Sequence, residues 1–363
     1  MKLLDKYLFT QVLWAFLFGL GLVSIVWIAP ELLPKVIREV VAGQLTPFEG
    51  FLFITYELPE VIVKSLPMGI LIGSLLVFDR LSKDSEVTAL RACGISVYRM
   101  LGSIIILGII GSIIGFTVNE TLVPKASLAQ EKLKYDGKLV SNHFTYVDKT
   151  KEDVIKQVIL IESFDGKNIK NIRIINFKPG SETREGIEEI FAAEEAEWLN
   201  NNWQLKNGIA YKLTESGVYQ STNIFAELFV PSNNQSYLLL KKSLKKPKNM
   251  NILEVKNYIE LLMDSKHAEE ARYFKVRYHQ KYSQPLASII MGIVGLILGI
   301  HMPRTSRFLG YTVGMFVILL YYFVWPLSMA LGNIGAFHPF IAAWLPNFLA
   351  IVIGLIILKY KDF

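Results

Sequence analysis

Three ionisable side chains lie close together inside an apolar stretch of the chain. The segment "ELPEVIVKSLPMG" contains Glu57, Glu60 and Lys64. Glu60 and Lys64 are four residues apart, so on a helix they share one face and can form an ion pair. Charges inside a membrane span are costly and usually face protein or water. The cluster is therefore either an ion-coupling site or a set of side chains that extend to the lipid headgroups. Pro59 and Pro67 are expected to interrupt the helix that carries it.

A basic pair follows the first apolar run, in the segment "PELLPKVIREVV". Lys35 and Arg38 can meet anionic headgroups or a phosphorylated substrate at a membrane surface. The alternative is an interfacial anchor that has no role in substrate binding.

The segment "DRLSKDSEVTALRACGISVYRM" separates two apolar runs and predicts a short helix of its own. Asp84 or Ser85 can cap this helix, and Glu86 then lies in its first turn, where the helix dipole favours an acid. Gly94 can adopt the left-handed conformation that ends a helix. The result is a compact helix at about residues 84–94.

Apolar residues recur along one side of this predicted helix. Val87, Leu90 and Cys93 are spaced by three and form a stripe, while Thr88 and Arg91 lie toward another side. A groove on a partner protein could hold the stripe. The alternative is a helix that lies flat on the membrane.

The sequence contains none of the common signatures of catalysis. It has no G-x-x-x-x-G-K-[ST] phosphate loop, no G-x-S-x-G elbow and no H-E-x-x-H pair. Its histidines have no metal-ligand spacing; they are His143, His267, His279, His301 and His338. We therefore expect no catalytic residue, no bound metal and no enzymatic activity.

Hydrophobic runs must position these candidate residues. The chain is 52% hydrophobic with a mean hydropathy of +0.36, which is typical of a membrane protein. Six runs are long enough to cross a bilayer: Leu8–Ala29, Phe51–Phe78, Met100–Val118, Leu286–Met302, Phe308–Leu331 and Phe340–Leu358. The first lacks a cleavage site and is interpreted as a retained span rather than a signal peptide. The fourth is expected to extend backward through "VRYHQKYSQP" as an amphipathic helix.

The charge distribution predicts how the spans are oriented. Basic residues gather before the first span, between spans two and three, between spans four and five, and after span six. The positive-inside rule places these segments and both termini in the cytoplasm. A net charge of +6 fits such loops better than nucleic-acid binding. The single cysteine, Cys93, excludes an intrachain disulfide.

The polar middle of the chain reads as β structure outside the cytoplasm. "QVILIESF", "NIRIINF", "NWQLKNGIAYKL" and similar stretches are separated by turn signals. This spacing favours a β-sandwich or jelly roll. A helical connection at about Ile252 to Ala271 leads back to the membrane. We predict three spans in residues 1–122, a β domain in 123–268 and three spans in 269–363.

Taken together, these features resemble the LptF/LptG family, the permease subunits of the bacterial lipopolysaccharide exporter. The similarity is carried by "LDKYLFTQ", "LPEVIVKSLPMGILIGSLL", "SEVTALRACGIS", "KYSQPLASI" and "MPRTSR", in this order along nearly the whole chain. It implies six transmembrane helices, three on each side of a periplasmic β-jelly-roll domain, in the bacterial inner membrane. The motifs fit both paralogous subunits, so a homodimer and a heterodimer both stay open.

The resemblance also implies a function and partners. An ABC-type exporter extracts lipopolysaccharide from the outer leaflet and passes it to periplasmic jelly-roll bridge proteins. A second permease subunit and a cytoplasmic ATPase dimer complete it, and ATP is used by the ATPase alone, so this chain binds no cofactor directly. The short helix would be the coupling helix that docks on the ATPase, through Ser85, Glu86, Thr88, Leu90, Arg91 and Gly94. Lys35 and Arg38 would contact lipid phosphates.

Two other functions remain open at this point. An ion-coupled secondary transporter would use Glu57, Glu60 and Lys64 as its coupling site. A non-transporting scaffold would only tether its β domain outside the membrane.

Overall fold

A computed structural model describes most of the chain. The described residues are 3–135, 144–149, 155–164, 169–178, 186–199, 202–214, 219–232, 237–238, 247–264, 267–300 and 309–360. They form two compact units. The first comprises the described parts of Met1–Leu133, Lys248–Lys256 and Arg272–Phe363, and the second those of Lys134–Pro247 and Asn257–Ala271.

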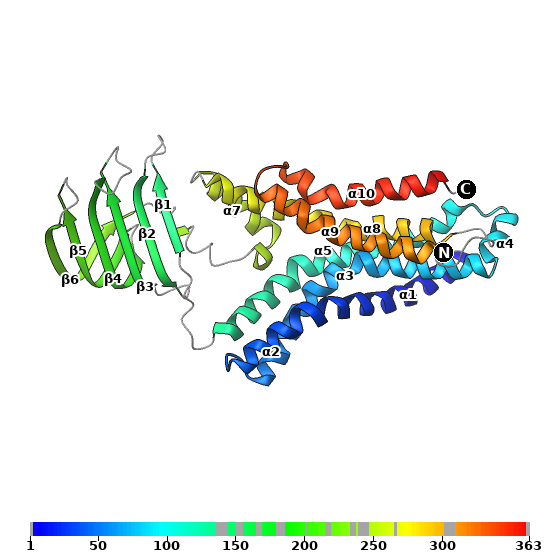
Figure 1. Ribbon diagram of the computed structural model, residues 1–363, viewed down its shortest axis with the longest axis horizontal. Coiled ribbons are helices and arrows are strands. Elements are labelled where there is room, and N and C mark those ends of the chain that lie inside the picture. The colour runs from blue at the N-terminus through cyan, green and yellow to red at the C-terminus, as the bar shows by residue number, and fades with distance from the viewer. Residues whose placement is uncertain are drawn as a thin grey trace. The chain divides into compact units, whose positions relative to one another are not determined.

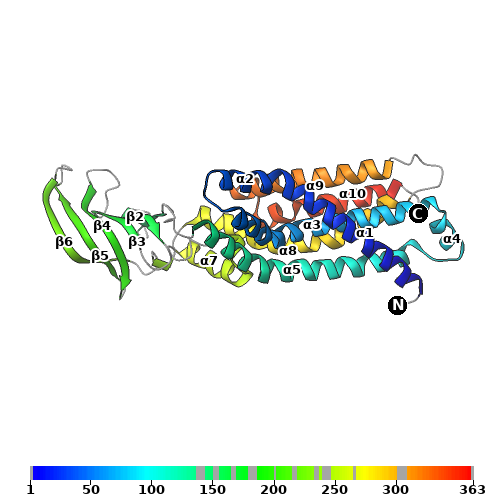
Figure 2. The ribbon, with the colours of Figure 1, turned by 90° about the horizontal axis from the view of Figure 1, so that it is seen from below.

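The first unit is a bundle of helices (Figure 1). Among the described residues, six of its helices are long and apolar enough to cross a membrane. They are α1 (Leu3–Trp27), α3 (Pro47–Lys83), α5 (Val97–Tyr135), α8 (Ala268–Gly299), α9 (Leu309–Asn333) and α10 (Pro339–Tyr360). This confirms the expected three-plus-three arrangement, and α8 extends backward from the fourth apolar run as predicted. The start of α1 and the end of α10 lie at one end of the bundle (Figures 1 and 2).

Helices α3 and α8 form the centre of the bundle, and glycines let the helices approach closely. A Cβ atom on Gly295 of α8 would lie 2.5 Å from the Leu71 carbonyl oxygen of α3. A Cβ on Gly108 of α5 would lie 2.9 Å from the Cα of Ile289. Such distances leave no room for a side chain, so α3, α5 and α8 are packed backbone to backbone.

Helix α3 runs through both of its internal prolines. It begins at a capping box, in which the Thr46 hydroxyl accepts from the Glu49 amide and the Glu49 carboxylate accepts from the Thr46 amide. Pro59 and Pro67 lie inside the helix, which continues to Lys83. The expected interruption is therefore wrong, because packing against neighbouring helices holds a span together although each proline removes one backbone donor.

The first span does not end where its apolar run ends. A π-helical turn, Ile28–Leu32, joins α1 to α2 (Leu33–Val41). Val36 of α2 packs against Phe53 near the start of α3. The basic pair is therefore held on a short helix that is braced against the second span.

The second unit contains a six-stranded antiparallel sheet, consistent with the expected jelly-roll-like domain. Its strands are β1 (Phe144–Lys149), β2 (Ile155–Phe164), β3 (Ile169–Phe177), β4 (Ile187–Leu199), β5 (Asn202–Leu213) and β6 (Tyr219–Pro231). Each strand pairs with the next in the chain. Ile159, Ile174 and Phe191 lie opposite one another across three strands and are all buried. This sheet stands between the third and fourth spans of the chain.

The connection from the sheet back to the bundle contains two helices. A short 3-10 turn, Pro247–Asn249, precedes α7 (Ile252–Asp264). The next helix, α8, begins at Ala268. The predicted helical connection therefore exists, and its described helical residues belong to α7 and the start of α8.

Candidate functional site

The predicted short helix is α4 (Glu86–Ala92), between the second and third spans. Ser85 occupies the capping position with a φ of 61°, and its side chain makes no capping hydrogen bond. The expected side-chain cap is therefore wrong, because a left-handed residue at this position turns the chain sharply into the helix instead. Gly94 has a φ of +79°, as expected for the residue that ends the helix.

Two of the three residues in the apolar stripe of α4 face the protein's own interior. Val87 is buried in one cluster with Leu8 of α1 and Met100 of α5, and Leu90 packs against the same cluster. Cys93 is exposed and takes no part in this packing. Val87 and Leu90 are therefore not open to a partner groove, because the first and third spans already cover them.

The opposite side of α4 is exposed to solvent. Thr88 and Arg91 are exposed, and Glu86 is half-buried. The Tyr7 hydroxyl of α1 donates a hydrogen bond of 3.0 Å to the Oε2 atom of Glu86. The sequence could not predict this contact, since Tyr7 lies 79 positions away from Glu86. The packing of Val87 and Leu90 and the hydrogen bond from Tyr7 together determine which face of α4 is exposed to solvent.

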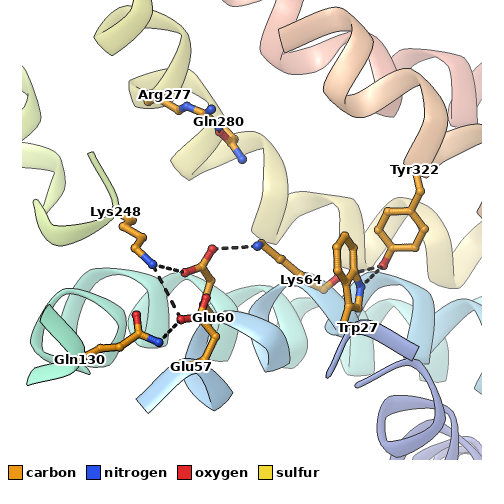
Figure 3. A network of polar contacts seen from close by, with 9 residues as sticks. All are labelled: Trp27, Glu57, Glu60, Lys64, Gln130, Lys248, Arg277, Gln280 and Tyr322. Atoms are coloured by element: carbon orange, nitrogen blue, oxygen red, sulfur yellow. Dashed lines mark hydrogen bonds and ion pairs between the residues drawn. The ribbon is translucent and has the colours of Figure 1, made fainter. Parts of the chain in front are cut away.

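The charged side chains of the second span belong to a polar network (Figure 3). Glu60 contacts Lys64 Nζ at 2.8 Å through Oε1 and Lys248 Nζ at 3.5 Å through Oε2. Lys248 also lies 3.8 Å from Glu57, and Gln130 donates to Glu57 at 2.5 Å. Each carboxylate therefore has a lysine beside it. Lys248 was not predicted, since it lies far along the chain in the 3-10 turn before α7.

Lys64 connects this network to two further spans (Figure 3). Its ammonium group lies 5.4 Å from the centre of the Trp27 ring, at the end of α1. The Trp27 ring packs edge-on against Tyr322 of α9, with centroids 5.2 Å apart. The Tyr322 hydroxyl donates to the Lys64 carbonyl oxygen at 3.3 Å and accepts from the Trp27 indole at 3.4 Å. Helices α1, α3 and α9 thus meet at one point.

The segment that leads from the sheet back to the bundle, which we call the return segment, makes hydrogen bonds to helices of the bundle. Asn249 donates to Glu131 at 2.9 Å, and the Ile252 amide donates to Glu120 at 2.7 Å. The other oxygen of Glu120 lies 2.7 Å from Lys281 of α8, and both side chains are largely buried. Together with Lys248, these contacts attach the return segment to α3, α5 and α8.

The basic pair lies on an exposed face of α2. The Lys35 ammonium group lies 5.7 Å from the centre of the Phe53 ring, and Arg38 Nε donates to the Pro34 carbonyl oxygen at 3.3 Å. Neither contact involves a carboxylate. Both cationic groups are exposed and open to an anionic ligand.

The sheet carries an open groove of about 680 Å³. Its lining combines apolar side chains with a few polar ones; among them are Ile172, Ile209, Phe225, Arg173, Glu194 and Asn207. Asn207 has a φ of 51°, and its row is skipped in the pairing of β5 with both neighbours.

One acid of strand β1 has a perturbed pKa. Burial raises the pKa of Asp148, although Lys156, a hydrogen bond from Tyr146 and His267 act in the opposite direction. The Tyr146 ring stacks on His267, with centroids 5.7 Å apart. Within the described parts of the chain, no three His, Cys, Asp or Glu side chains gather as a metal site would require.

Comparison with known proteins agrees with this architecture. The sequence profile described as "Lipopolysaccharide export system permease LptF/LptG" matches residues 6–360. The permease protein LptF of Escherichia coli K12 is 18% identical over 304 residues, which cover 82% of this chain and 79% of that protein. The LptF proteins of Escherichia coli O157:H7 and Shigella flexneri match to the same extent. The chain therefore belongs to the LptF/LptG family of lipopolysaccharide export system permeases.

Proposed function

We propose that this protein is the permease subunit of an ABC-type exporter in the bacterial inner membrane. It extracts lipopolysaccharide from the outer leaflet and passes it to a periplasmic bridge of jelly-roll proteins. A separate cytoplasmic ATPase binds and hydrolyses ATP. The family assignment supports the transport role. The geometry of α4 is the observation that supports binding of this protein to an ATPase.

Helix α4 suits a contact that transmits force. It has seven residues and connects two membrane spans. Val87 anchors it in the core, and Thr88 and Arg91 extend from its other side. A partner that moves this exposed face also moves the ends of the spans, because the buried face is packed on them. Glu86 is the residue through which we expect the ATPase to bind.

The charges support an orientation with α4 in the cytoplasm. Basic side chains gather at the α4 end of the bundle; they include Lys6, Arg80, Lys83, Arg91, Arg99 and Lys359. The single span α5 separates α4 from the strands in the chain. The sheet therefore lies in the periplasm when α4 lies in the cytoplasm.

Lipopolysaccharide would be handled at the opposite end of the spans. Lys35 and Arg38 are exposed cations that suit its phosphate groups. The groove of the sheet, with Phe225 and Ile209 in its lining, suits part of its acyl chains. Within the described strands, β6 has β5 as its one neighbour, and its other edge can pair with a strand of a bridge protein.

A second permease subunit would complete the lipid cavity. Large apolar side chains are exposed along α1 and α9, among them Trp14, Phe18, Phe316 and Phe323. In a membrane such surfaces face lipid or another subunit.

The test of this proposal is the substitution Glu86→Ala. We expect the ATPase to be lost from the complex purified in mild detergent, and lipopolysaccharide export to stop. The matched control is Glu188→Ala, which removes an exposed acid from β4 and should retain both. Retention of the ATPase together with export at the wild-type level in Glu86→Ala would refute the role of α4.

The ion-coupled alternative has less support from the geometry. Glu57 and Glu60 both contact Lys248, and Glu60 also contacts Lys64. Carboxylates that are already neutralised by lysines suit a structural network better than a site that binds and releases a cation. Collapse of the proton gradient distinguishes the two functions: it should leave ATP-driven export unchanged in proteoliposomes and abolish ion-coupled transport.

A further inference from the structure

We propose that Tyr7 is a positioning residue that holds Glu86 against α1, so that α4 and α1 move together. This inference rests on the proposed contact between α4 and the ATPase. Its central observation is the 3.0 Å hydrogen bond from the Tyr7 hydroxyl to Glu86 Oε2. Among the described residues, Tyr7 is the hydrogen-bond partner that the structure gives Glu86, and the bond uses one of the two carboxylate oxygens.

The backbone around Tyr7 is fixed on the same support as α4. Leu8 and Val12 of α1 are buried in the cluster that also contains Val87. The Ser103 hydroxyl of α5 donates to the Asp5 carbonyl oxygen at 3.3 Å. The hydroxyl of Tyr7 therefore projects from a rigid turn, and it limits the conformations available to the Glu86 carboxylate.

The same helix reaches the point where three spans meet. From Tyr7 to Trp27, α1 is continuous and spans about 30 Å. A Cβ atom on Gly73 of α3 would lie 2.6 Å from the Phe16 nitrogen, so α1 is attached closely to α3 along the way. Trp27 then contacts Tyr322 and Lys64. A displacement of Glu86 that carries Tyr7 is thus passed along a rigid helix to the opposite end of the bundle.

The protein contains a convenient probe for this link. Cys93 is the single cysteine of the chain, and it is exposed directly after α4. A nitroxide label on Cys93 reports the mobility of α4 by electron paramagnetic resonance, without any substitution of other cysteines. Tyr7→Phe removes the hydroxyl and keeps the ring. The matched control is Tyr98→Phe, at an exposed tyrosine near the start of α5.

We expect Tyr7→Phe to raise the mobile fraction of the label about 2- to 10-fold, the usual effect of losing one hydrogen bond. Tyr98→Phe should leave it unchanged. Because Tyr7 acts through Glu86, the double variant Tyr7→Phe/Glu86→Ala should be no more mobile than Glu86→Ala alone. In the complex with its ATPase, Tyr7→Phe should also lower the lipopolysaccharide moved per ATP hydrolysed, a ratio that a loss of folded protein does not change.

Two results would overturn the inference. The first is a mobile fraction of the Cys93 label in Tyr7→Phe equal to that in Tyr98→Phe. The second is a double variant Tyr7→Phe/Glu86→Ala in which the increases in mobility of the two single variants add in full. Both are measured on the permease without the ATPase. They are therefore independent of the pull-down of the Glu86→Ala variant, which tests the proposed function itself.

Discussion

Replacing Lys281 by methionine should destabilise the helix bundle, because it leaves a buried carboxylate without its counter-charge. Lys281 Nζ lies 2.7 Å from Glu120 Oε1, and the two side chains are 8% and 17% exposed. The Oε2 atom of Glu120 accepts the Ile252 amide, which is the first of α7. The ion pair therefore connects α5, α8 and the return segment.

The expected magnitude follows from the burial of the pair. Removing one partner of a buried ion pair costs about 3–5 kcal/mol. Glu120 keeps some solvent contact and its hydrogen bond to Ile252, so we expect about 2–4 kcal/mol for Lys281→Met. For a unit of this size, that corresponds to a fall of about 5–15 °C in the apparent Tm.

The assay is thermal unfolding of the purified protein in detergent. The measured quantity is the fraction of protein that stays monodisperse after heating to each temperature. The double variant Lys281→Met/Glu120→Gln removes both charges and should recover at least about half of the loss. A matched control is Lys206→Met on the sheet. Its partner Glu197 lies 3.3 Å away and is 46% exposed, so the change should cost below about 1 kcal/mol.

An apparent Tm of Lys281→Met equal to that of Lys206→Met would contradict a stabilising role of the buried pair. A double variant less stable than Lys281→Met would also contradict it, since neutralising Glu120 should relieve the uncompensated charge.

Three further predictions concern other parts of the molecule. Gly73→Ala places a methyl group against the backbone of α1 and should cost about 1–3 kcal/mol in the same melting assay, whereas Gly102→Ala, in a helix and with open space around it, should be neutral or stabilise by up to about 1 kcal/mol. Burial raises the pKa of Asp148, so the folded wild type should lose stability as the pH rises from about 4 through that raised value; unfolding curves of Asp148→Asn should lack this loss, and equal pH slopes would contradict it. A photo-crosslinking residue in place of Lys35 or Arg38 should trap lipopolysaccharide, and silence at both positions would count against their contact with its phosphates.

The membrane architecture could be predicted from the sequence because a span is a local property. A helix that crosses a bilayer needs about 20 apolar residues in succession, and the described residues of all six predicted runs lie on or directly beside the long helices of the bundle; residues 301, 302 and 308 of the predicted runs lie outside the described residues. Gly94 is a similar case, since the left-handed conformation that ends a helix is most easily adopted by glycine. Such features depend on neighbours within a few residues.

The partners of the candidate residues could not be predicted, because they come from distant parts of the chain. Lys248 reaches Glu57 and Glu60 only after the sheet has intervened. Periodicity alone could not show what the apolar stripe on α4 contacts. A stripe that packs on Leu8 and Met100 has the same spacing as one that binds a partner. Only the positions of the first and third spans distinguish the two.

The glycine packing at the centre of the bundle has a consequence for synthesis of the chain. Leu71 and Gly108 belong to spans that enter the membrane early, while their partners Gly295 and Ile289 are made after all six strands. The ribosome therefore completes the sheet before the centre of the bundle can close. A chain truncated within the sheet leaves glycine-lined helix faces open in the lipid. Close packing at the centre of the bundle therefore forms only when the helices from both halves of the chain are present.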